Sequence, residues 1–350
     1  MKNFNPTGTD GFDFLEFTTT DFQKLDSQFK QMGFTPVAKH QSCDVILYQQ
    51  NDIRFLVNTT QNSLASQFAG LHGASTSAMG FRVKNAKQAF EHALANGAKA
   101  YQPSTEKGIY NIPAIYGVGN SLIYFVEYQN DKANYAHHFT PLPNQVTNEK
   151  NANLTYLDHV THNLHRGNMD QWADFYERIF NFREIRYFDI EGKLTGLKSR
   201  AMTSPCGKIR IPLNESSDDK SQIEEFLKDF NGEGIQHIAL GTNNIYSTVE
   251  QLRDNGLVFL DTPDTYYDLI EKRLPDHGEP IDILKQNRIL IDGNTHAEKE
   301  LLLQIFTKNM LGPVFFEIIQ RKGDEGFGEG NFKALFESIE LDQIQRGVLS

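Results

Sequence analysis

Three polar side chains interrupt apolar segments of this chain in a way that packing alone does not explain. His159 lies in LDHVTHNL, His237 lies in GIQHIALG, and Glu317 lies in VFFEIIQR. A buried carboxylate without a partner is costly, and a divalent cation bound by all three side chains would remove that cost. Two neutral imidazoles and one carboxylate leave coordination positions open, and this ligand set suits non-heme Fe(II) in oxygenases. The sequence therefore predicts a ferrous centre.

Each of these residues also has a purely structural interpretation. A strand histidine is more often a hydrogen-bonded core or edge residue than a ligand, and a glutamate in an apolar run commonly faces outward. His162 and His165 are local competitors of His159. His162 is three residues further on and so lies on the opposite face of an extended strand, and His165 lies at its polar end. The three candidate ligands are 78 and 80 residues apart, so only a repeated fold could bring them together.

An internal repeat supplies such a fold. A helical pattern over residues 22–32 that closes at Gly33 recurs over residues 169–180 and closes at Asn181. The segment AMGFRVKNAKQAFEHALANGAKAY matches IQHIALGTNNIYSTVEQLRDNGLVF, and SLIYFVEY matches PVFFEIIQR. We therefore expect an α+β chain of tandem βαβββ repeats whose sheets curl around a cavity in each half.

The expected boundaries follow from composition. Residues 1–130 form the N-terminal barrel, residues 131–153 form a linker rich in Asn and charge, and residues 154–350 form the C-terminal catalytic barrel. An amphipathic pattern predicts a C-terminal lid helix at about residues 331–346. The preceding GFGEGNF, residues 326–332, lacks the glycine spacing of a dinucleotide-binding loop and is interpreted as a hinge.

The two halves differ at the positions that could do chemistry. His159 and His237 of the second half match Phe14 and Gly80 of the first in this comparison. Polar ligand residues are therefore expected only in the second half, and the first half is interpreted as degenerate and free of metal.

Composition excludes several classes of function. The net charge of −11 argues against a nucleic-acid or anionic-membrane surface, because such partners require concentrated Lys and Arg. No apolar stretch is long enough for a membrane span or a signal peptide, so a cytoplasmic protein is expected. Cys43 and Cys206 form no C-x-x-C pattern, and the sequence contains neither H-E-x-x-H nor G-x-S-x-G. Small molecules are the expected partners.

Longer motifs resemble a known family. LDHVTHNL, SPCGKIRIPLNE, GEGIQHIAL, LLLQIFTKN and PVFFEIIQRKGDEGFGEGNFKALFESIE are similar to the 4-hydroxyphenylpyruvate dioxygenases, which are vicinal-oxygen-chelate proteins, and GFDFLEF and MGFRV extend the similarity to the first half. The resemblance implies two barrels with Fe(II) held only in the C-terminal one, by His159, His237 and Glu317. It also implies conversion of 4-hydroxyphenylpyruvate and O2 to homogentisate and CO2 in tyrosine catabolism, without 2-oxoglutarate.

The resemblance further implies a substrate pocket of neutral polar and aromatic side chains. Amides and a hydroxyl can bind a phenol without burying another charge, and phenylalanines can stack on its ring. One departure is Leu341, which stands where the family tends to have a basic residue. A homo-oligomer is also expected. The implied pocket residues are Ser204, Asn214, Gln222, Gln236, Gln304, Phe327 and Phe332.

Three alternatives remain open at the level of sequence. A hydroxymandelate synthase would use the same substrate and oxidise its benzylic carbon, although Phe332 favours the dioxygenase. A metal-free binding module could use the same scaffold. An extradiol catechol dioxygenase would share the ligand set and would release no CO2.

Overall fold

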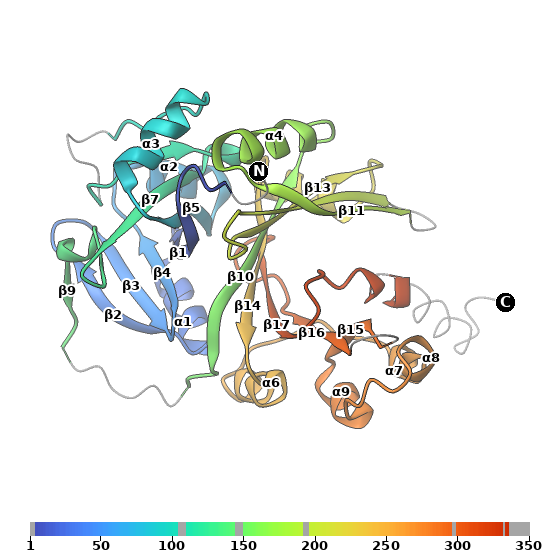
Figure 1. The fold of residues 1–350 in the computed structure, drawn as a ribbon. Coiled ribbons are helices and arrows are strands. Elements are labelled where there is room, and N and C mark those ends of the chain that lie inside the picture. Colours follow the sequence, from blue (N-terminus) through green and yellow to red (C-terminus); the bar gives the residue numbers. More distant parts are fainter. Residues whose placement is uncertain are drawn as a thin grey trace.

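The computed structural model describes residues 4–103, 110–143, 150–191, 196–295, 299–331 and 333–335. Its two sheets lie side by side, each with helices packed on it (Figure 1). The first half contains β1 (Thr9–Thr18), α1 (Phe22–Gln31), β2 (Thr35–His40), β3 (Val45–Gln50), β4 (Ile53–Asn58), α2 (Leu64–His72), β5 (Ser75–Val83), α3 (Ala86–Ala95), β6 (Ala114–Tyr116), η1 (Val118–Asn120), β7 (Leu122–Gln129), β8 (Lys132–Ala133), η2 (Ala136–His138) and β9 (Phe139–Pro141).

The second half begins with the long strand β10. Its elements are β10 (Leu154–Leu164), α4 (Met169–Phe180), β11 (Arg183–Glu191), β12 (Gly196–Thr203), β13 (Arg210–Ser216), α5 (Gln222–Phe230), β14 (Gly234–Thr242), α6 (Ile245–Asp254), α7 (Asp264–Asp268), α8 (Ile270–Arg273), α9 (Ile281–Asn287), β15 (Leu290–Asn294), β16 (Glu300–Phe306) and β17 (Phe315–Lys322).

The strand orders confirm the predicted repeat. The first sheet runs β6-β7-β5-β1-β4-β3-β2-β9, and the second runs β11-β12-β13-β10-β14-β17-β16-β15. Each central strand, β1 or β10, pairs in parallel with one neighbour and antiparallel with the other. Read backwards from β16, the second order is β16-β17-β14-β10-β13-β12-β11, and it corresponds strand for strand to β6-β7-β5-β1-β4-β3-β2 of the first sheet. The short strands β8 and β9 lie within the segment predicted as a linker, and β9 pairs with β2. The domain boundaries stay a prediction.

Helix ends follow the sequence signals. Gly33 after α1 has φ +88°, and Asn181 at the end of α4 has φ +56°, which is the left-handed backbone that both residue types tolerate. Helix α4 buries Tyr176, Ile179 and Phe180 on one face, as its periodicity predicts.

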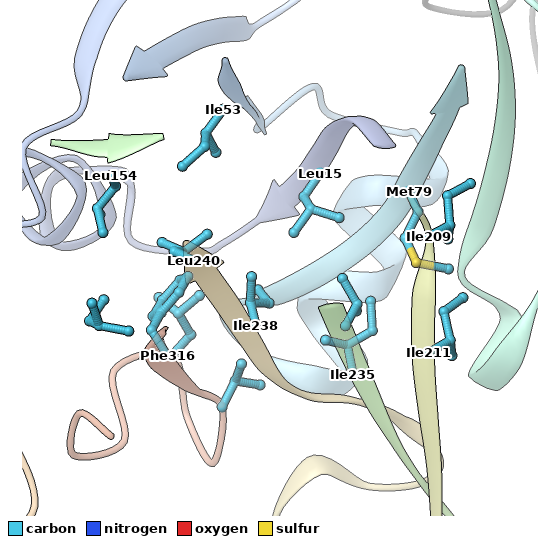
Figure 2. Packing of buried hydrophobic residues seen from close by; sticks show 14 of the residues in the cluster. Leu15, Ile53, Met79, Leu154, Ile209, Ile211, Ile235, Ile238, Leu240 and Phe316 are labelled. Atoms are coloured by element: carbon cyan, nitrogen blue, oxygen red, sulfur yellow. The ribbon is translucent and has the colours of Figure 1, made fainter. Parts of the chain in front are cut away.

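The main core fills the space between the two sheets and fixes the strands that carry the site. Ile238 and Leu240 of β14 and Phe316 of β17 point into it, where they meet Leu15 and Met79 of the first half (Figure 2). Side chains alternate along a strand, so these apolar residues alternate with His237, Ala239 and Glu317 on the opposite face. The same strands thus bury one face between the halves and present the other to a cavity.

The predicted lid helix is only partly covered by the structure. Residues 329–331 and 333–335 have helical backbone, and the segment that follows β17 lies at the open side of the second sheet (Figure 1). The rest of the predicted helix, with Phe332 and Leu341, lies outside the described residues. Among the helices that the structure describes, none is both long and apolar enough to cross a membrane.

Candidate metal centre

Three adjacent strands, β10, β14 and β17, bring the predicted ligands together. His159 pairs with Ala239, and Ala239 pairs with Glu317, so these three residues form one row across the sheet. Directly paired residues point to the same face, and His237 shares it because it lies two residues from Ala239. The methyl side chain of Ala239 leaves the space between His159 and Glu317 open.

The ligand atoms converge on one point. The Nε2 atom of His159 lies 3.2 Å from Oε2 of Glu317, and Nε2 of His237 lies 3.6 Å from the same oxygen. One ligand atom from each side chain lies within 4.8 Å of the others. Ligands about 2.1 Å from a metal at right angles are about 3 Å apart, so these distances suit a shared cation. The spacing of the three residues along the sequence could only suggest that they lie together.

Neighbouring side chains orient both imidazoles. Nδ1 of His159 lies 2.8 Å from Oδ1 of Asp158, and Nδ1 of His237 lies 2.6 Å from Oε1 of Gln236. Both oxygens accept hydrogen bonds, so each Nδ1 donates. Nε2 of His159 then faces Glu317, and Nε2 of His237 faces both Glu317 and the Thr161 hydroxyl, which lies 2.9 Å from it. Fixing the tautomer through the outer nitrogen is how proteins usually prepare a metal-binding histidine.

The burial of the Glu317 carboxylate indicates whether a cation fits this site. Glu317 is 2% exposed, and its Oε1 atom has no hydrogen-bond partner among the described residues. An isolated buried carboxylate is expensive, and a divalent ion would compensate both its charge and its free oxygen. The donor set of two imidazoles and a carboxylate therefore fits a metal of the non-heme iron type.

Electrostatics distinguish the two histidines in the metal-free protein. Burial lowers the pKa of His237 well below its ordinary value, and nearby His159 and His162 lower it further, so this ring is neutral. Burial also lowers the pKa of His159, but the Glu317 carboxylate and the hydrogen bonds with Asp158 and Glu317 outweigh burial and raise it. A bound cation would take the place of that proton.

The first half carries aromatic and small residues at the corresponding positions. Phe14 pairs with Gly80, which pairs with Tyr124, in the row that matches His159, Ala239 and Glu317. By this register Ala78, two residues before Gly80, stands where the second half has His237. The sequence comparison that matched His237 with Gly80 was therefore wrong by two residues, although the strand face is the same.

In the first half, aromatic rings occupy the place that corresponds to the candidate metal site. The rings of Phe14 and Tyr124 are 5.8 Å apart, and Tyr110 packs against both. Among the described residues, a cluster with metal-binding geometry occurs only in the second half. The two halves thus differ in the residues at these positions, and a first half without metal stays a prediction.

A cavity of about 80 Å³ opens above the three candidate ligands. Ser199, Pro212 and Asn214 form one wall, and Phe327 packs edge-on against His159 at 5.2 Å. The cavity is smaller than the roughly 150 Å³ that holds one benzene molecule. An aromatic ligand therefore fits only if part of the cavity wall moves or if the ligand extends out of the cavity. The remaining lining residues are Thr161, Phe188, Leu197, Phe306 and Glu329.

Two of the predicted pocket residues, Asn214 and Phe327, line this cavity. The Oε1 atom of Gln236 instead accepts a hydrogen bond from Nδ1 of His237. Gln304 is two residues from Phe306 and so on the same strand face, but it is 2% exposed and lies beneath the backbone of Gly328.

Two further predicted residues lie away from the cavity lining. Ser204 is buried in a turn, where its hydroxyl accepts a hydrogen bond from the backbone N–H of Ile209. Gln222 is exposed at the first residue of α5. The geometry gives neither residue a contact with the candidate metal site, and their substrate roles remain predictions.

Ser199 is one of the polar lining residues that sequence reasoning missed, together with Thr161 and Glu329. It pairs directly with Asn214 between β12 and β13, so both side chains point to the same face. The signal was present in the alternation of KSRAMTS, but it could be used only once the register of these strands was known.

Comparison with known families covers both halves. Residues 3–140 match the family described as Hydroxyphenylpyruvate dioxygenase, HPPD, N-terminal. Residues 156–270 match the Glyoxalase/Bleomycin resistance protein/Dioxygenase superfamily. The paired curled sheets are those of the vicinal-oxygen-chelate fold, as expected.

Individual relatives match over the full length. A 4-hydroxyphenylpyruvate dioxygenase of Pseudomonas aeruginosa is 56% identical over 352 residues, covering 100% of this chain and 98% of the relative. A Vibrio vulnificus protein named Hemolysin VllY is 57% identical over 351 residues, covering 99% and 98%. A solved mutant of 4-hydroxymandelate synthase from Streptomyces coelicolor is 25% identical, with a TM-score of 0.80, and the match covers 96% of this chain and 99% of that one.

Proposed function

The chain belongs to the 4-hydroxyphenylpyruvate dioxygenase family, and on that premise we propose that His159, His237 and Glu317 hold Fe(II) for the oxidation of 4-hydroxyphenylpyruvate. The proposed reaction consumes the keto acid and O2 and yields homogentisate and CO2. Because the two bacterial relatives carry different names, the assignment of this substrate depends on the site as well as on similarity.

One observation carries the proposal. The buried Glu317 places one oxygen 3.2 Å and 3.6 Å from the imidazole nitrogens of His159 and His237, while its other oxygen has no partner among the described residues. This arrangement supports a cation with three protein ligands on one side and exchangeable positions on the other.

The charges of the site suit an α-keto acid. Fe(II) with Glu317 carries one net positive charge, so a monoanionic keto acid that chelates through its carboxylate and keto oxygens brings the site to neutrality. No separate arginine clamp is then required. When bound, the metal supplies the chelation point and the electrons for reaction with O2.

The protein side chains have separate tasks. Asp158 and Gln236 keep a proton of each histidine on Nδ1, so that a cation can replace the contact with Glu317 at Nε2 of His159 and the contact with the Thr161 hydroxyl at Nε2 of His237. Phe327 and Phe306 line the cavity with apolar rings, which would exclude water around a bound substrate. Ser199 and Asn214 offer neutral hydrogen-bonding groups to the polar end of the substrate without burying a further charge.

Oxygen consumption by the iron-loaded protein tests this function directly. With 4-hydroxyphenylpyruvate and Fe(II), we expect O2 uptake with equal amounts of CO2 and homogentisate. His237→Ala removes a proposed ligand and should abolish both iron binding and turnover. His165→Ala is the matched control, because His165 is exposed and lies outside the cavity lining.

The products separate the remaining alternatives. Hydroxymandelate without homogentisate would assign the chain to the activity named for the Streptomyces coelicolor relative. Consumption of catechols without CO2 would indicate an extradiol dioxygenase. A folded chain that binds no metal would be a binding module. A cytoplasmic location and a homo-oligomeric state also remain proposals, which cell fractionation and light scattering can test.

A further inference from the structure

Arg321 forms an ion pair with the carboxylate that orients His159. Its Nε and Nη2 atoms donate to the two oxygens of Asp158, both at 2.8 Å. One of those oxygens also accepts from Nδ1 of His159 at 2.8 Å. Asp158 is fully buried and the Arg321 side chain is 8% exposed, so this bidentate contact is shielded from solvent.

The same guanidinium also holds the turn beyond β17. Its Nη1 atom donates to the backbone carbonyls of Asp324 at 3.0 Å and Gly326 at 2.7 Å. The next residue, Phe327, packs its ring edge-on against His159, and the guanidinium carbon of Arg321 lies 5.7 Å from that ring. Arg321 therefore contacts both the partner of a proposed ligand and the segment that forms the cavity wall.

The first half provides an internal comparison. Asp13 precedes Phe14 as Asp158 precedes His159, and Tyr128 stands at the position of Arg321, four residues after Tyr124. Tyr128 donates one hydrogen bond of 2.6 Å to Asp13. A buried aspartate on β1 or β10 with a donor two strands away, on β7 or β17, is thus common to both halves. The additional donors of arginine, which reach the turn, occur in the half with the ligand cluster.

We propose that Arg321 is a positioning residue that couples the orientation of His159 to the placement of the Phe327 wall. The inference rests on the proposed metal site. Arginine is suited to this role because its planar fork can satisfy a carboxylate and two carbonyls at once, whereas lysine presents a single charged nitrogen. Loss of the fork removes the two short hydrogen bonds to Asp158 and those to the turn together, and leaves Arg210 3.6 Å from Asp158 as its remaining cationic partner.

Cobalt(II) binding provides a test that does not depend on turnover. Arg321→Lys keeps the charge and Arg321→Gln removes it, so the pair separates the effect of charge from that of geometry. Tyr128→Phe is the matched control, because it removes one of the two tyrosine hydroxyls that donate to Asp13 in the half without ligands, the other being that of Tyr135. For each folded variant we would measure the affinity for Co(II), the visible spectrum of the Co(II) protein, and hydrogen exchange over residues 320–331.

Both Arg321 variants are expected to bind Co(II) about ten- to a hundredfold more weakly, the usual effect of removing an outer partner of a metal ligand. They should also show an altered Co(II) spectrum and faster exchange at residues 324–327. Tyr128→Phe should leave affinity and spectrum unchanged. Because Arg321→Lys retains a positive charge beside the buried Asp158 carboxylate, it should fold even if Arg321→Gln does not.

Wild-type affinity, within about twofold, in a folded Arg321→Lys variant would overturn the inference while leaving the proposed metal site intact. An equal loss in Tyr128→Phe would also overturn it, because the effect would then be general loosening. Failure of the wild-type chain to bind Co(II) would remove the metal site and this inference together.

Discussion

His162 illustrates how a histidine beside the site differs from a ligand. It is completely buried, and burial lowers its pKa from 6.5 to about 4. Its Nε2 atom has no partner among the described residues. The sequence placed it on the strand face opposite His159, and its absence from the lining of the cavity agrees with that placement.

The lowered pKa of His162 predicts a dependence of stability on pH. The unfolded chain binds a proton at this residue below pH 6.5, whereas the folded chain does so only near pH 4. Its contribution to stability is therefore complete above pH 6.5 and falls, by up to about 3 kcal/mol, as the pH drops toward 4. Denaturant unfolding of the metal-free protein and of His162→Gln at pH 7.5 and 5 should show a smaller loss in the variant. Equal losses of unfolding free energy in the two proteins would show that His162 is not a source of the pH dependence.

Ser199, Asn214 and Ser204 allow substrate contacts to be separated from structural ones. Removing one hydrogen bond to the substrate costs about 0.5–1.5 kcal/mol, so Ser199→Ala and Asn214→Ala should each raise KM by up to about tenfold with metal content unchanged. Ser204→Ala should instead lower stability without affecting KM, because that hydroxyl serves the Ile209 amide. Steady-state kinetics with metal analysis measures this. A larger increase in KM for Ser204→Ala than for the other two variants would support the sequence-based prediction that Ser204 binds the substrate.

At the scale of elements, the sequence predicted most where signals are local. Apolar alternation and the repeat identified β10, β14 and β17, and residues tolerant of positive φ marked the helix ends at Gly33 and Asn181. Register could not be read from one strand. The irregularities in the pairing of β1 with β5 recur at corresponding residues of β10 and β14, so the two-residue error arose in aligning the apolar segments of β5 and β14, where a shift of two residues keeps the same face. The missed Ser199 has the same origin, because its significance depends on a partner strand.

The turn after β17 gives a prediction at this scale. Gly328 has φ +79°, and a Cβ there would lie 2.1 Å from Oε1 of Gln304. Gly207 has a similar φ of +73° but open space around it, which makes Gly207→Ala a matched control. Both substitutions should cost about 1–2 kcal/mol of stability from backbone strain alone. Gly328→Ala should in addition displace the Phe327 wall and raise KM. The same KM in both variants would show that the turn does not shape the cavity.

At the scale of the molecule, the halves share one core. Phe55 of the first half packs at 4.7 Å from Phe17, and both rings lie near Phe316 of the second half, at 6.2 Å and 6.4 Å. Phe316 is the strand neighbour of Glu317 and points to the opposite face. The first half therefore supports the backbone of the candidate metal site although it contributes no ligand to it.

Phe55→Ala tests this shared core. Removing a buried phenylalanine costs about 3–5 kcal/mol, so the midpoint of denaturant unfolding should fall markedly. Because the core spans both halves, fluorescence and circular dichroism should still report a single transition. In the folded variant, metal content should remain at the wild-type value. Two separate transitions would mean that the halves unfold independently.

The aromatic filling of the first half also limits what single substitutions can achieve there. Placing a ligand set in it would require changes at Phe14, Ala78 and Tyr124 together, because imidazole or carboxylate groups introduced singly would meet packed rings rather than a cation. Each intermediate would lose packing before gaining any coordination. A second metal site in this chain is therefore not within reach of a single substitution, because the packed rings of the first half would have to be replaced as a set.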